Sequence, residues 1–125
     1  MVSSITASEL AREIPSGSTV ALVGFGGMGQ CDKILRAIGH SFKTTGTPNN
    51  LTVFHTAGQS DRSNGIEYIA EEGLISKVIG GHWGLAPKTS KLIEENKIEC
   101  HCWPQGQLTH LLRAMANKLP GQIDR

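Results

Sequence analysis

The sequence has no long hydrophobic run, no excess of charge of one sign and few aromatic residues. None of its apolar runs approaches the roughly 20 residues that cross a membrane. Its 12 basic and 11 acidic side chains leave a net charge of +1 and are interspersed, so they form no basic stripe for nucleic acid. The start, MVSSITASELAREI, lacks the basic end and apolar core of a signal peptide. We therefore expect a cytoplasmic protein without a nucleic-acid or membrane partner.

Cysteine is also scarce, with Cys31, Cys100 and Cys102 as the three examples. An odd number cannot pair completely within one chain. The triplet Cys100-His101-Cys102 has no second pair of ligands downstream at the spacing of a zinc site. We expect reduced thiols and no metal site.

The chain instead alternates short apolar runs with amphipathic segments. Runs of strand length occur at 18–23, 51–55, 77–79 and 98–102, and the first has the composition of a strand covered on both faces. Helices are predicted after the capping box at 6–9, over 31–43, 66–71 and 87–96, and along the stripe of Leu108, Leu111, Leu112 and Met115. In the last strand, Glu99 and His101 are expected on the face opposite Cys100.

This alternation predicts one α/β domain over residues 1–125, Rossmann-like, with three layers and a mostly parallel sheet. The closing residues KLPGQIDR end a helix at Pro120-Gly121 and then read as the lead-in to another element. We therefore expect a truncated domain.

A glycine-rich or turn-forming segment follows each predicted strand. These segments cover 24–29, 58–65, 80–84 and 104–106. Ligands of open α/β sheets bind beyond the carboxyl ends of the strands, so the four segments are expected to line one crevice. For any single segment, a tight turn without a ligand is an equally good explanation.

The first segment, GFGGMG, has the glycine spacing of a dinucleotide-binding fingerprint. The acidic residue that would bind ribose belongs at the end of the second strand, where this chain has His55-Thr56. Asp32 also places a negative charge in the helical turn where a phosphate would dock. Bare amides at such a turn can instead stabilise the oxyanion of a thioester or carboxylate, which is the interpretation we favour.

The order of these motifs resembles the family I coenzyme A transferases. The resemblance rests on 17–29 and on 73–88, GLISKVIGGHWGLAPK, continuing through 95–99 and 104–106. It is similar to the amino-terminal, alpha-type half of the acetate and 3-oxoacid branch, which acts in short-chain fatty acid or ketone body metabolism. The resemblance implies CoA transfer between an acyl-CoA and a short-chain or 3-oxo acid, with CoA as substrate and no other cofactor.

In that family a glutamate attacks the thioester, and a glutamyl-CoA intermediate follows. The glutamate belongs to the carboxyl-terminal half, so the resemblance implies that half, or a beta-type subunit, as a partner. Complete members are expected to be homo-oligomers. This chain alone is expected to be inactive.

The resemblance also implies roles for individual residues. Gln105 would polarise the thioester carbonyl, unless it is a turn glutamine bonded to local backbone. The substrate-binding residues would be Gly24, Gly26, Gly27, Met28, Gly29, Gly81, His82 and Gly106. Phe25 would pack beneath them, Met28 could equally fill the core, and buried structural roles remain open for His82 and Trp83.

The sequence gives less support to other candidate catalytic groups. The glutamates fall on helical faces and are interpreted as solvated charges; they are Glu67, Glu71, Glu72, Glu94 and Glu95. His55 and His101 lie on separate strands without the serine and carboxylate of a hydrolase triad. Two alternatives to a transferase remain: a non-enzymatic domain that binds a nucleotide or acyl-CoA, and an inactive gene fragment with an uncovered apolar face.

Overall fold

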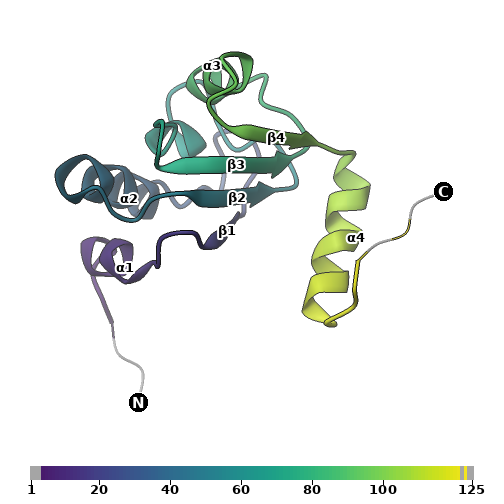
Figure 1. Cartoon of the computed structure of the whole chain (residues 1–125). Coiled ribbons are helices and arrows are strands. Elements are labelled where there is room, and N and C mark those ends of the chain that lie inside the picture. The colour runs from purple at the N-terminus through teal and green to yellow at the C-terminus, as the bar shows by residue number, and fades with distance from the viewer. Residues whose placement is uncertain (1–3, 122, 124–125) are drawn as a thin grey trace.

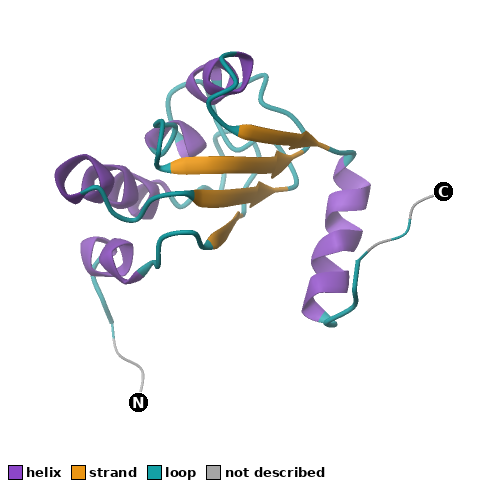
Figure 2. Cartoon of the chain, in the orientation of Figure 1, coloured by secondary structure: helices purple, strands orange, loops and turns teal. Residues whose placement is uncertain are grey.

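The computed structural model describes residues 4–121 and 123. Its centre is a parallel sheet of four strands in the order β1-β2-β3-β4. The elements are α1 (Ala7–Glu13), β1 (Thr19–Leu22), α2 (Asp32–Thr45), β2 (Leu51–His55), the 3-10 helix η1 (Gly65–Tyr68), β3 (Ile75–Gly80), α3 (Pro87–Glu94), β4 (Glu99–Cys102) and α4 (Gln105–Ala116). Helical segments connect successive strands, so all strand carboxyl ends meet at one edge (Figure 1, Figure 2). The predicted α/β class with a parallel sheet is confirmed.

Local signals in the sequence explain where several helices begin and end. At α1, the Thr6 hydroxyl accepts a hydrogen bond from the Glu9 amide, and the Glu9 carboxylate accepts one from the Thr6 amide at 2.6 Å. At the end of α2, Gly46 adopts a φ of 76° and its N–H donates to the Phe42 carbonyl oxygen. Pro87 occupies the first turn of α3. The helix predictions at these three places are confirmed.

The hydrophobic core lies on one face of the sheet. Leu22, Val53 and Val78 point to this face from three neighbouring strands, and Leu35 and Ile38 of α2 pack against them. Side chains of α1, η1 and α3 join the same cluster, so these helices cover the same side of the sheet. Strand residues alternate between the two faces, which leaves the intervening positions on the other side.

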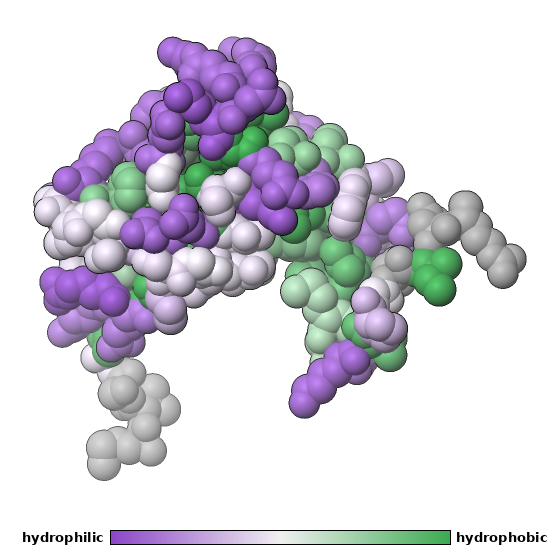
Figure 3. Space-filling model, in the orientation of Figure 1, coloured by the Kyte–Doolittle hydropathy of each residue, from purple (hydrophilic) through white to green (hydrophobic). Residues whose placement is uncertain are grey.

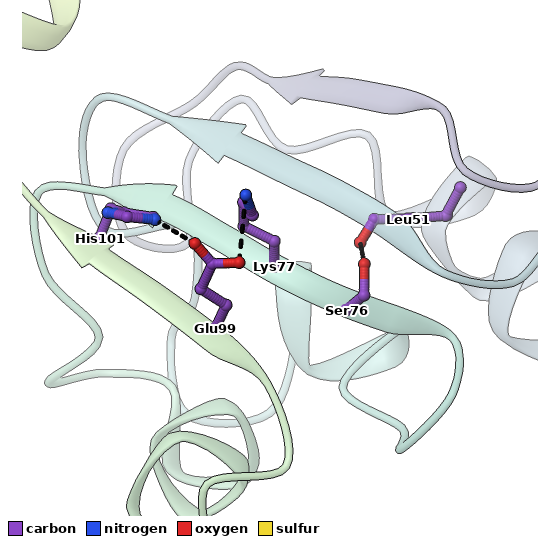
Figure 4. Close-up of polar contacts among 5 residues, drawn as sticks. All are labelled: Leu51, Ser76, Lys77, Glu99 and His101. Atoms are coloured by element: carbon purple, nitrogen blue, oxygen red, sulfur yellow. Dashed lines mark hydrogen bonds and ion pairs between the residues drawn. The ribbon is translucent and has the colours of Figure 1, made fainter.

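That other face carries a cluster of charged side chains in its β3–β4 half. Lys77 Nζ lies 3.1 Å from one oxygen of Glu99, and His101 Nε2 lies 2.6 Å from the other (Figure 4). The hydrogen bonds from His101 and then Lys77 hold the pKa of Glu99 below its usual range. The predicted placement of Glu99 and His101 on one face is confirmed.

The predicted strand covered on both faces and the predicted third layer are not found among the described residues. β1 is an edge strand whose Thr19 and Ala21 are exposed, and the adjacent Val23 is 80% exposed, because the helices cover only the core face. The predicted last helix forms as α4, but it runs past the carboxyl ends of the strands rather than across the sheet (Figure 1). Helices α1 to α3 therefore make one layer on one side, and β1 is not covered on both faces.

The three cysteines are unpaired, and Cys31 and Cys102 are exposed. None of the helices in the described part of the chain is long and apolar enough to cross a membrane. Of the predicted lead-in at 122–125, all but residue 123 lies outside the described residues.

Candidate functional site

The four segments that follow the strands lie together at the carboxyl edge of the sheet, and we call 24–30, 56–65, 80–86 and 102–106 the rim. The Gly26 N–H donates to the Gly58 carbonyl oxygen at 2.8 Å, which joins the first segment to the second. A Cβ on Gly58 would come within 2.6 Å of the His82 ring, so the second meets the third. The Trp103 N–H donates to the Gly80 carbonyl oxygen at 3.1 Å, so the third meets the fourth. The prediction of one shared edge is confirmed.

The glycine loop folds as a tight turn rather than as an open row of amides. Phe25 and Met28 exchange backbone hydrogen bonds of 3.0 and 2.9 Å around Gly26 and Gly27, and both side chains are exposed. Phe25 therefore does not pack beneath the loop, and Met28 is not core. Because the amides of Phe25, Gly26 and Met28 are bonded within the protein, the prediction that the loop leaves its amides bare is wrong for these three.

Other amides of the same loop remain unbonded. Within the described residues, the N–H groups of Gly27 and Gly29 have no hydrogen-bond partner. Gly29 adopts a φ of 68°, which glycine reaches without strain, and Asp61 packs so closely that a Cβ on Gly27 would lie 3.1 Å from it. The unbonded backbone donors of the loop are thus these two N–H groups together with that of Gly24, which likewise has no partner among the described residues.

Gly24 has a structural reason to be glycine. Its φ is 141°, and a Cβ there would lie 2.9 Å from the Met28 carbonyl oxygen. The buried Gln59 side chain donates to the Gly24 carbonyl oxygen and so ties the first and second rim segments together. Sequence reasoning missed Gln59, because nothing distinguishes it from the other polar residues of its loop.

The geometry does not suit a dinucleotide. Gln30 and Cys31 separate the glycine turn from α2, and the Asp32 carboxylate stands in the first turn, where it accepts a 3.0 Å hydrogen bond from the Gly65 N–H. A carboxylate at a helix N-terminus occupies the place that a phosphate would need. The fingerprint interpretation is therefore not supported.

Gln105 is the first residue of α4, after Pro104 at its N-cap, rather than a residue of a turn. Its side chain lies against Gly81, since a Cβ on Gly81 would be 2.8 Å from Gln105 Cγ. Among the described residues, the Gln105 side-chain amide has no hydrogen-bond partner, so it is not held by local backbone. Gly106 follows it in the helix with open space beside it.

His82 and Trp83 differ in their exposure. Trp83 is buried, and its ring meets the His55 ring edge-on with centroids 5.5 Å apart. His82 is exposed on the rim, and its Nδ1 accepts a 3.3 Å hydrogen bond from the Gly84 N–H. Trp83 is structural, whereas His82 faces solvent beside Gly58.

His55, the last residue of β2, is buried under the rim. Its Nδ1 lies 2.6 Å from the Ala57 carbonyl oxygen, and its Nε2 has no partner among the described residues. Burial lowers the pKa of His55, although the bond to Ala57 opposes this, and His82 adds to the lowering. Gly80 is glycine because the ring occupies its Cβ position, at 2.4 Å from Cε1. Because the ring is 1% exposed, it is not accessible to a substrate as a general base.

The interpretation of Glu67 as a solvated charge is wrong. Glu67 is 2% exposed, and one carboxylate oxygen accepts from the Lys88 N–H at 2.9 Å. The other accepts from the amide and hydroxyl of Thr89. The first turn of a helix has amides without internal partners, and Glu67 satisfies those of α3 from 21 residues away.

The remaining carboxylates are either at the surface or already bonded. Glu71 and Glu72 form surface ion pairs with Lys43 and Lys97, and Glu94 and Glu95 are exposed, as predicted. On the rim, Asp61 accepts hydrogen bonds from Asn64 and Ser63, which lower its pKa. No group of three or more His, Cys, Asp or Glu side chains in the described residues is arranged to hold a metal ion.

Comparison with known proteins agrees with this architecture. The chain is 39% identical to the acetate CoA-transferase YdiF of Escherichia coli K12 over 121 residues, and 39% identical to the caffeate CoA-transferase of Acetobacterium woodii over 126. These alignments take in 95% and 100% of this chain but only 23% and 24% of the relatives. The chain therefore spans about a quarter of their length.

Solved structures give the same result. The chain superposes with a TM-score of 0.90 and 38% identity on a thioester complex with CoA of the acyl-CoA transferase YdiF from E. coli O157:H7, over 94% of this chain and 23% of that one. A decarboxylase, AibA/AibB, shares the fold at a TM-score of 0.70 and 17% identity, over 93% of this chain and 44% of that one. Residues 4–125 match the family described as coenzyme A transferase, and the chain belongs to that family.

Proposed function

We propose that this chain supplies part of the substrate-binding rim of an acyl-CoA:carboxylate CoA-transferase whose nucleophilic glutamate lies outside these residues. The observation that carries the proposal is the meeting of all four strand exits at one rim, with the free amide of Gln105 beside Gly81. Family membership over residues 4–125 supports this interpretation. The substrates are an acyl-CoA and a short-chain or 3-oxo carboxylic acid.

In the proposed reaction, this chain acts on the thioester carbonyl. The Gln105 amide donates to the carbonyl oxygen, and the Gly27 and Gly29 amides are further donors for the oxyanion that forms. The glutamate of the remaining polypeptide attacks the carbonyl carbon and expels the CoA thiolate, which leaves an acyl anhydride. The thiolate then attacks the glutamyl carbonyl and releases the acid, so that CoA is held as a thioester.

Hydrogen bonding and burial of the carboxylates of this chain favour placing the nucleophile elsewhere. The Asp61 and Asp32 carboxylates accept backbone hydrogen bonds, and Asp61 packs against Gly27 of the glycine loop. Glu67 is buried as the cap of α3. A carboxylate that attacks a thioester must be reachable by substrate, which the buried Glu67 is not. Asp61 is exposed, but the hydrogen bonds from Ser63 and Asn64 stabilise its charge, lower its pKa and so weaken it as a nucleophile.

The test is a full-length chimera in which this chain replaces the matching segment of the E. coli acetate CoA-transferase. We expect the isolated chain to move no CoA between acetyl-CoA and short-chain acids, and the chimera to do so. Transfer by the isolated chain would disprove the division of labour, and a folded but inactive chimera would disprove the proposed role.

Ligand binding separates this proposal from the dinucleotide alternative. Calorimetric titration of the folded chimera with acetyl-CoA should release or absorb heat, while NAD should give none. Heat with NAD alone would reverse the conclusion.

A further inference from the structure

Helix α4 exposes an apolar stripe for which the described chain has no cover. Leu108 is buried, but Leu112 and Met115, on the same side of the helix, are exposed, with Met115 at 52%. Ala114, which is also buried, lies about 120° around the helix from Leu108. Leu119, just beyond the helix, is 57% exposed. In Figure 3, hydrophobic colour gathers over the position that α4 occupies in Figure 1.

The opposite side of α4 is polar. Thr109, His110 and Arg113 lie there and are exposed. With 3.6 residues per turn, Leu108, Leu112 and Met115 share one side of the helix while His110 lies away from them. α4 is therefore amphipathic along its length, and its apolar side is buried at Leu108 but exposed at Leu112 and Met115.

An uncovered helix of this length needs tertiary packing. Isolated helices shorter than about 12–15 residues are marginal in water, and α4 has 12 residues. Its stability has to come from burial of its apolar side, and the described residues provide that burial only around Leu108. Something outside these residues is expected to cover Leu112, Met115 and Leu119.

We propose that the occupant is the remainder of the transferase polypeptide, and that its docking on α4 fixes the position of Gln105. The length of the relatives supports this choice, because about three quarters of each lies beyond the matched segment. Gln105 is the first residue of α4, so an unfixed helix leaves the amide donor of the rim unfixed as well. The inference rests on the proposed function for the identity of the occupant.

Proteolysis tests docking without using activity. Trypsin cleaves after Arg113, which lies within α4, and cleavage within a helix requires local unfolding. We expect rapid cleavage at Arg113 in the isolated chain and at least about tenfold slower cleavage in the chimera, which corresponds to about 1.4 kcal/mol of added local stability. Equal rates in the two proteins would overturn the inference.

Matched substitutions on the apolar and polar sides of α4 test which side is the docking surface. In the chimera, Leu112→Asp combined with Met115→Asp should restore rapid cleavage and reduce CoA transfer, while His110→Asp on the polar side should do neither. In the isolated chain, the same double substitution should leave the midpoint of unfolding unchanged, which shows that the variant folds. Persistent protection in the double variant would refute the apolar stripe as the docking surface.

The cleavage and activity measurements distinguish a failure of docking on α4 from a failure of the proposed function. A chimera that protects α4 but transfers no CoA would contradict the proposed function and support docking. An active chimera with unprotected α4 would contradict docking alone. Dimerisation of the isolated chain that Leu112→Asp abolishes, without protection in the chimera, would assign the stripe to a second copy and overturn the choice of occupant.

Discussion

Gln105 and Gly81 are in direct contact across the rim. A Cβ on Gly81 would lie 2.8 Å from Gln105 Cγ and 2.6 Å from the Thr56 carbonyl oxygen. The Thr56 backbone belongs to the segment that follows β2, and Gln105 begins α4. The absence of a side chain at position 81 therefore lets two rim segments close around a third.

Gly81→Ala is expected to destabilise the chimera by about 1–3 kcal/mol and to lower CoA transfer, because the Thr56 backbone or Gln105 must move. Denaturant unfolding and steady-state kinetics measure the two effects. Gly84→Ala is the control, since its Cβ would meet only His82 Nδ1 at 3.7 Å, and it should stay within about 0.5 kcal/mol of the parent. Equal behaviour of the two variants would contradict the close approach.

Gln105→Ala is expected to lower the kcat of the chimera on the order of 100-fold, the cost of losing one preorganised oxyanion donor. Its unfolding midpoint should not change, because the side chain is exposed and has no partner in the described residues. Gln105→Glu, which keeps the shape but removes the amide donor, should be similarly impaired. Full activity of either variant would remove Gln105 from the reaction.

Gly106→Ala separates helix stability from substrate contact. Alanine is favoured over glycine in a helix by about 1 kcal/mol, and a Cβ at position 106 meets nothing within 4 Å. We expect a higher unfolding midpoint together with lower CoA transfer, because the resemblance implies that substrate approaches this backbone. Unchanged transfer would reduce Gly106 to an ordinary residue of the first helical turn.

Periodicity and capping chemistry were sufficient to predict the order of the helices and strands in this fold. The capping box of Thr6 and Glu9, Pro87 at the start of α3 and the short apolar runs predict the α/β order, and the structure confirms it. These signals are local, so a single sequence contains them. The parallel pairing then follows from the helical connections between strands.

Contacts between distant residues were not predictable in the same way. The amide of Gly26 is taken by Gly58, and Glu67 is buried as the cap of a helix that starts 20 residues later. Neither pairing has a periodic or short-range signature. The exposure of Met115 was also missed, because a stripe of apolar residues marks the side of a helix to be covered without saying which residues cover it.

Glu67→Gln is expected to destabilise the protein by about 1–3 kcal/mol. The carboxylate accepts three hydrogen bonds from Lys88 and Thr89, and the amide of glutamine would turn a donor toward a donor. Denaturant unfolding of the isolated chain measures the loss. Glu94→Gln at an exposed position should change stability by less than about 0.5 kcal/mol. A neutral Glu67→Gln would show that the cap contributes little.

His55 makes stability depend on pH. The ring is 1% exposed, its Nδ1 is bonded to the Ala57 carbonyl, and its Nε2 is enclosed without an acceptor in the described residues. Protonation would place a buried charge and an unpaired N–H under the rim, and burial accordingly lowers the pKa of His55.

Because the pKa of His55 is lower in the folded state, the unfolded chain binds the proton first. The free energy of unfolding is therefore highest above the ordinary histidine pKa of about 6.5 and falls below it, by at most about 1.4 kcal/mol per pH unit until the folded pKa is reached. Denaturant unfolding of the isolated chain between pH 8 and pH 5 measures this slope. His55→Asn should flatten it, whereas His110→Gln, at an exposed position, should leave it unchanged. Parallel curves for the parent and His55→Asn would show that protonation of the ring is not resisted by the fold.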